Sequence, residues 1–321
     1  MTSNDDRAER VTSAPRIGRR GLLGGATVLA ASGAVFAGGG AAAAAGGPDQ
    51  PPLTIIPVPE QVPAREGYAP VPGGRLWYWD TGGRGTPIIL MHPGSGSGEI
   101  WPYQQPYFAK AGYRVIGFSM RGKFGSSAPD PANPGTGADD LHSLVQFLGI
   151  DRFHLVGVAY GGGVALDYAL TREARLLSLS ISGSLTSVTN PDYVAMLRRL
   201  RPTGFNDMPA SFIELGPSYR ALNPEGMHAW EEIHDRASTS DVGQPYATSP
   251  TWADVERLRV PTLLLWGDGD LYSPPSVQRV MASHFRNVET FVADECGHAP
   301  HWERPDVYNP TLRRFLRKHS R

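Results

Sequence analysis

Short apolar runs recur along the chain and predict buried β-strands. They lie between glycine- and proline-rich turns, at residues 87–92, 113–118, 153–158, 176–182 and 261–266. The run at 87–92 is continuously apolar rather than alternating, which is typical of a strand covered on both faces. An alternating strand is expected before them at 74–80, and a further strand after them at 288–292.

Apolar residues between these runs recur at helical spacing. Helices are expected around 101–111, from Tyr160 to about residue 170, and on the faces formed by Leu141, Leu144, Val145 and Leu148 and by Tyr308, Leu312, Phe315 and Leu316. Strands and helices therefore alternate, which predicts an α/β fold with a mostly parallel sheet covered by helices.

The alternation stops between residues 190 and 258. No strand pattern is evident there, while aromatic residues and prolines are scattered, and Pro224 opens a helix that carries Trp230 and Ile233. A segment of this length between two strands is uncommon unless it is functional. We interpret it as a largely helical cap inserted before the late strands. The alternative is a long irregular loop on the surface.

The N-terminal 47 residues have the order of a signal peptide. A polar stretch ends in Arg19-Arg20, a weakly apolar Gly/Ala-rich stretch follows, and Ala43-Ala44-Ala45 fits a cleavage site. The arginine pair resembles a twin-arginine signal, which predicts export to the periplasm or medium. An uncleaved membrane anchor and a low-complexity tail are the alternatives. After cleavage no stable membrane association is expected.

These patterns divide the rest of the chain into a linker, a core and a cap. We expect a linker at 48–63, core segments at 64–189 and 259–321, and the cap at 190–258. The 321 residues carry a net charge of −1 with no basic run beyond the N-terminus, so nucleic acid is not an expected partner. The single cysteine, Cys296, excludes an intrachain disulfide and a cysteine-based zinc site.

The run at 155–163 combines a buried strand, a sharp turn and the start of a helix. Its order, Gly157-Val158-Ala159-Tyr160-Gly161, matches the G-x-Nu-x-G pattern of a nucleophile elbow. The two glycines allow the strand and the helix to approach closely. The nucleophile position itself is occupied by Ala159, which has no nucleophilic atom.

Three further loops follow predicted strands, where open α/β sheets bind ligands. They run from His92 to Gly96, from Trp266 to Asp270 and from Glu295 to Pro305. No P-loop and no G-x-G-x-x-G in a strand–helix context is present, so neither cofactor nor metal is expected. A small molecule is the expected partner.

From about Leu76 to Leu316, the order of these motifs and their residue types resemble the α/β-hydrolase superfamily. The similarity is greatest to its capped esterase, lactonase, aminopeptidase and epoxide-hydrolase-like branch. The resemblance implies that Asp270 is the acid and His298 the base, with Gly94 and Tyr160 giving the N–H groups of an oxyanion hole.

Other roles are expected for several nearby residues. Asp268 is the alternative acid, and His92 and His301 are expected to orient loops. Cys296 is expected to be a buried, inert thiol. Substrate-pocket candidates are His92, Ser95, Ser119 and Trp230.

Three positions depart from the family pattern. Ala159 replaces the nucleophile, Pro93 replaces the usual Gly after His92 and removes an N–H, and Ser119 replaces the usual Asp of its loop. Ala159 is either an engineered Ser-to-Ala change or a natural departure. We expect an enzyme acting on an ester, lactone or amide of a small, partly apolar molecule. The alternatives are cofactor-free lyase or proton-transfer chemistry through His298, and a non-catalytic binding protein.

Overall fold

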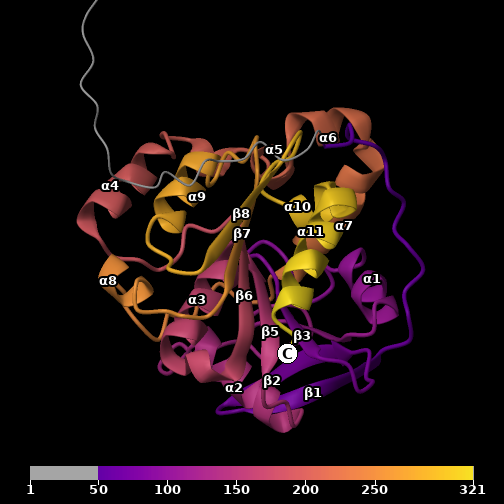
Figure 1. Cartoon of the computed structure of the whole chain (residues 1–321), viewed down its shortest axis with the longest axis vertical. Coiled ribbons are helices and arrows are strands. Elements are labelled where there is room, and N and C mark those ends of the chain that lie inside the picture. Colours follow the sequence, from indigo (N-terminus) through magenta and orange to yellow (C-terminus); the bar gives the residue numbers. More distant parts are fainter. Residues whose placement is uncertain (1–49, 321) are drawn as a thin grey trace, which may run out of the picture. The chain divides into compact units, whose positions relative to one another are not determined.

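An eight-stranded sheet forms the centre of the computed structural model, which describes residues 50–320 (Figure 1). The spatial order is β1-β2-β4-β3-β5-β6-β7-β8. The strands are β1 (Arg65–Val71), β2 (Gly74–Asp80), β3 (Pro87–Met91), β4 (Arg114–Phe118), β5 (Phe153–Val158), β6 (Leu176–Ser182), β7 (Thr262–Gly267) and β8 (Val288–Ala293). The pairs β1·β2 and β2·β4 are antiparallel, and all others are parallel. The predicted α/β-hydrolase architecture is confirmed.

The strands expected from the apolar runs are all present, whereas β1 was not predicted. This edge strand leaves most of its residues exposed and includes Pro70, so it lacks the apolar run that marks the inner strands. It pairs with β2 in register from Arg65–Asp80 to Val71–Gly74.

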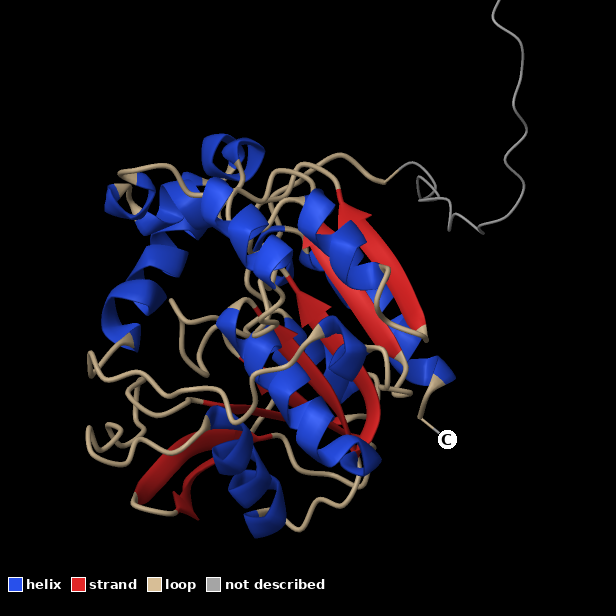
Figure 2. Ribbon diagram, turned by 90° about the vertical axis from the view of Figure 1, so that its left-hand side faces the viewer, coloured by secondary structure: helices blue, strands red, loops and turns tan. Residues whose placement is uncertain are grey.

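Helices cover both faces of the sheet (Figure 2). They are α1 (Gln104–Lys110), α2 (Gly137–Phe147), α3 (Tyr160–Arg172), α9 (Pro275–Ala282), α10 (Pro300–Glu303) and α11 (Pro305–Lys318), with a short 3₁₀ turn, η1 (Glu173–Arg175), after α3. Figure 1 shows α3 and α9 on one side of the sheet and α1 and α11 on the other.

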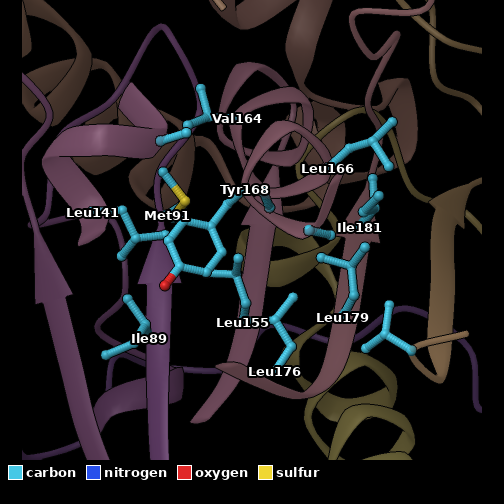
Figure 3. Packing of buried hydrophobic residues seen from close by; sticks show 14 of the residues in the cluster. Ile89, Met91, Leu141, Leu155, Val164, Leu166, Tyr168, Leu176, Leu179 and Ile181 are labelled. Atoms are coloured by element: carbon cyan, nitrogen blue, oxygen red, sulfur yellow. The ribbon is translucent and has the colours of Figure 1, made fainter. Parts of the chain in front are cut away.

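Two apolar clusters fill the spaces between sheet and helices. On one face, Ile89 and Leu155 pack with Leu141 of α2 (Figure 3). On the other face, their strand neighbours Leu90 and Val156 pack in a second cluster. Successive residues of β3 and β5 therefore enter different cores, which explains why these strands are apolar throughout.

The segment between β6 and β7 contains helices and no strand within 190–258. They are α4 (Pro191–Arg199), η2 (Phe205–Asp207), α5 (Ala210–Glu214), α6 (Pro217–Leu222), α7 (Pro224–Ala237) and α8 (Trp252–Val255). The predicted helix that begins at Pro224 is confirmed as α7. The last part of the segment belongs structurally to the sheet, because Trp252, Val255 and Leu258 are buried in the core beside α3 and α9.

Residues 50–63 of the predicted linker contain no helix or strand but hydrogen-bond to distant parts of the core. Gln50 Nε2 donates to the Val292 carbonyl (2.8 Å), and the Val62 N–H donates to Gln105 Oε1 (3.0 Å). The predicted signal segment, 1–47, lies outside the described residues. Among residues 50–320, no helix has both the length and the apolar character needed to cross a membrane.

Candidate active site

The turn from β5 to α3 has the backbone geometry that the glycine pattern predicts. A Cβ on Gly157 would lie 2.4 Å from the Gly161 carbonyl oxygen, and one on Gly161 would lie 2.5 Å from the His92 carbonyl oxygen. Only glycine fits such contacts. Ala159, between them, has φ 51° and ψ −118°, a strained conformation for a residue with a side chain. Its N–H donates to the Ser182 carbonyl (2.9 Å), which fixes the turn against β6.

His298 and Asp270 are brought together from the loops that follow β8 and β7. His298 Nδ1 lies 2.8 Å from Asp270 Oδ2. The carboxylate also accepts the N–H groups of Tyr272 and Ser273 (2.8 Å each) and the Ser273 hydroxyl (2.9 Å), so its orientation is fixed. Asp268, the alternative acid, instead accepts the Cys296 N–H (3.0 Å).

The surroundings of His298 favour its protonated form. Burial lowers the pKa of His298, but the charge and hydrogen bond of Asp270, with a contribution from Glu214, outweigh this effect and raise the pKa above its ordinary value. With Nδ1 donating to Asp270, Nε2 is the nitrogen that can accept a proton. The geometry therefore suits general-base chemistry followed by proton donation.

The predicted oxyanion donors, Gly94 and Tyr160, lie side by side. A Cβ on Gly94 would lie 3.3 Å from the Tyr160 Cβ. Tyr160 is the first residue of α3, so its N–H has no partner within the helix. Within residues 50–320, neither N–H donates to another protein group. Both are therefore available to a carbonyl oxygen of a ligand.

His92 orients the Gly94 N–H from below the site. Its Nε2 accepts the Met120 N–H (3.0 Å), so Nδ1 carries the proton and donates to the Pro93 carbonyl (2.7 Å). The C=O and N–H of a trans peptide point in opposite directions, so holding the Pro93 carbonyl fixes the direction of the Gly94 N–H. Burial lowers the pKa of His92 to about 3, which keeps this ring neutral.

A cavity of about 430 Å³ lies over these groups. Gly94, Ser95, Ala159, Tyr160 and His298 line it together with residues of the cap. Its volume suits a small molecule. Sheet and cap residues share the lining, so any ligand would contact both.

Three of the predicted pocket residues do not line this cavity. His92 is fully buried and acts through the Pro93 peptide, as described above. Ser119 is also fully buried, and its hydroxyl accepts the Gly98 N–H (3.0 Å). Trp230 packs in the core and stacks on His234 (5.3 Å between ring centroids), and it is His234 that reaches the cavity. Of the four candidates only Ser95 lies in the lining.

The main residue that the sequence did not indicate is Glu214, at the end of α5. Its Oε2 accepts the Ser95 hydroxyl (2.7 Å), and its main-chain carbonyl accepts the His298 N–H (2.8 Å). Burial raises the pKa of this carboxyl group. One cap residue thus contacts both the loop from His92 to Gly96 (the oxyanion loop) and the loop from Glu295 to Pro305 (the histidine loop). No motif marks it, because cap segments have no fixed spacing relative to the catalytic loops.

Lys123 holds the oxyanion loop from the other side. Its ammonium group donates to the Gly94 carbonyl and to the Ser238 hydroxyl (2.7 Å).

Cys296 is buried and burial raises the pKa of its thiol, which disfavours the nucleophilic thiolate. Among residues 50–320, no group of three or more His, Cys, Asp or Glu side chains is placed to hold a metal ion.

The fold and the site define a member of the α/β-hydrolase family. The model of that family matches residues 88–311, more than half of the chain, and the chain belongs to it.

Comparisons with individual proteins agree with this family assignment. The chain is 26% identical over 277 residues to a 2-hydroxy-6-oxononadienedioate/2-hydroxy-6-oxononatrienedioate hydrolase of Burkholderia vietnamiensis, covering 76% of this chain and 91% of the relative. A thermophilic esterase from Thermogutta terrifontis superposes with a TM-score of 0.66 at 26% identity, covering 80% of this chain and all of the esterase. A bromoperoxidase from Bacillus anthracis superposes with a TM-score of 0.65 at 24% identity and shares the fold, covering 79% and 100% of the two chains. The relatives are hydrolase-type enzymes.

Proposed function

We propose that this protein hydrolyses an ester, lactone or amide of a small, partly apolar molecule, using His298 and Asp270 to activate water. The observation that carries the proposal is the 2.8 Å contact between His298 Nδ1 and Asp270 Oδ2 beside a cavity that Ala159 also lines. An alanine at this position forms no acyl-enzyme, so the attacking group must come from outside the protein. The names of the hydrolase and esterase relatives support the reaction class.

The proposed reaction proceeds in two steps. His298 Nε2 takes a proton from water as the water oxygen bonds to the carbonyl carbon, and the carbonyl π electrons move to its oxygen. The N–H groups of Gly94 and Tyr160 stabilise this oxyanion. When the tetrahedral intermediate collapses, the bond to the leaving oxygen or nitrogen breaks, and that atom takes the proton from His298.

The test compares the protein with its H298A variant on a series of 4-nitrophenyl esters. We expect the Ala159 protein to exceed the spontaneous rate by roughly 10³-fold, the order of residual catalysis that survives without a nucleophile. We expect H298A to lose most of this rate, and intact-mass spectra to show no acyl adduct. Equal rates for the protein and H298A would exclude a histidine-driven mechanism.

Proton transfer at a carbon atom is the second candidate. It is favoured by one specific observation, namely that His298 keeps its acid partner while the nucleophile position holds Ala159. Such an enzyme would exchange a proton next to a carbonyl group with solvent deuterium without hydrolysis, whereas a binding protein would return its ligand unchanged.

We also propose that residues 1–47 direct export, based on the twin-arginine-like order of that segment. Cell fractionation tests this: a chain carrying R19K and R20K should stay in the cytoplasm, and unchanged export would refute the proposal.

A further inference from the structure

Arg201 stands out among the residues of the catalytic cavity because its charge has no partner. It lines the cavity just after α4, and its Nε is buried without a hydrogen-bond acceptor in residues 50–320. No carboxylate of that range forms an ion pair with it. Arg121 and Arg304, the largely buried arginines elsewhere, pair with Asp140 (2.7 Å) and Asp306 (2.9 Å). A partly buried cation without an anion is costly unless a ligand supplies one.

The guanidinium is held close to the reacting groups by aromatic contacts. Its central carbon lies 4.8 Å from the centroid of the Tyr272 ring, and that ring lies 4.9 Å from the ring of His298. Phe205 packs edge-on against Tyr272 (5.3 Å). The Tyr272 ring thus contacts both the cation and the proposed base.

Glu214 and Arg201, both in the cavity lining, have different partners. Glu214 Oε2 already accepts the Ser95 hydroxyl. Burial raises the pKa of Glu214. Arg201 contacts the ring of Tyr272. The lining also contains the apolar Leu185, Met208 and Ile213 and the polar Ser184, Thr186 and Asn206.

We propose that Arg201 binds a carboxylate group of the substrate, a few bonds from the carbonyl that reacts. The planar guanidinium matches a carboxylate in a two-point contact, and a single cation suits a monoanion better than a doubly charged phosphate. The substrate is then an ester, lactone or amide with an apolar middle and an acidic end. This inference rests on the proposed function for the position of the reacting carbonyl.

The experiment measures binding rather than turnover. Two fluorescent ketones of equal length serve as probes, 5-(2-naphthyl)-5-oxopentanoate and 1-(2-naphthyl)pentan-1-one. They differ only in a terminal carboxylate or methyl group, and neither has a leaving group. We expect the carboxylate to bind about tenfold or more tightly than the neutral ketone, the effect of a hydrogen-bonded ion pair that is partly shielded from water.

Variants assign the preference to one side chain. R201Q should abolish it, and R201K should keep part of it, because the charge remains but the two-point geometry is lost. R220Q is the matched control, since Arg220 stacks on Phe212 (4.5 Å) and does not line the cavity. A preference that survives in R201Q, no preference in the parent protein, or no binding of either ketone at millimolar concentration would overturn the proposal. Because no turnover is measured, these results are independent of the hydrolysis experiment.

Discussion

At the scale of single residues, the proposed function depends on Ala159, which combines a strained backbone with a side chain that has no reactive atom. A positive φ at a non-glycine residue costs about 1–3 kcal/mol and persists only where the surrounding structure imposes it. Here the close approaches at Gly157 and Gly161 impose it. We therefore propose that the site differs from that of a serine hydrolase by one oxygen atom, at Ala159.

The pKa of His298 gives a prediction that needs no substrate. Asp270 raises this pKa, and only neutral His298 acts as a base, so activity should fall as the pH drops through the pKa. D270N removes the carboxylate charge and should lower the pKa of His298. The loss of activity in acid should then occur at a lower pH. Nuclear magnetic resonance titration of the imidazole C–H protons measures the shift.

The neighbouring carboxylate provides the control for this titration. Asp268 contacts the Cys296 N–H rather than His298, so D268N should leave the titration of His298 nearly unchanged. Equal shifts in D270N and D268N would contradict the assignment of Asp270 as the partner.

At the scale of elements, the sequence predicts the sheet better than the cap. The inner strands are recognisable because both of their faces are buried, and Asp270 because it follows such a strand, β7. His298 follows β8, an edge strand that is only partly buried, so its position depended on the family resemblance. The edge strand β1 lacks this signal. His92 and Ser119 also follow inner strands, but their side chains turn into backbone contacts beneath the cavity, which a loop position alone does not reveal.

The cap residues could not be predicted for a different reason. Glu214 and Arg201 reach the cavity only because short helices fold back over the sheet, and those helices have no fixed spacing from the catalytic loops. Trp230, in contrast, was predicted to line the pocket and does not. It is a large aromatic residue on a correctly predicted helix, yet it faces the core, and His234, one turn later, faces the cavity.

At the scale of the whole molecule, buried histidines link stability to pH. Burial lowers the pKa of His301 to about 3, and neither ring nitrogen has a partner in residues 50–320. The unfolded chain, with a histidine pKa near 6.5, then binds more protons than the folded chain between about pH 3 and pH 6.5. Stability is therefore present above pH 6.5 and is lost as the pH falls, by about 1.4 kcal/mol per pH unit for this residue.

Replacing His301 by phenylalanine should remove this sensitivity to acid. The ring packs against Trp101 (4.9 Å) in apolar surroundings and loses no hydrogen bond. We expect H301F to be more stable than the parent by about 2 kcal/mol at pH 5, with a smaller difference at pH 7. Urea unfolding at both pH values measures this, with the exposed His228 changed to Gln as the control. A difference that does not depend on pH would contradict the prediction.

The central claim is that Ala159 lies in a hydrolase site that is complete except for one oxygen atom, and A159S tests it most directly. Rapid mixing of A159S with 4-nitrophenyl butyrate should give a burst of about one 4-nitrophenol per protein, followed by steady turnover. The parent protein should show no burst, and adding H298A to A159S should abolish it. A folded A159S protein that shows neither a burst nor a gain in rate would contradict the account.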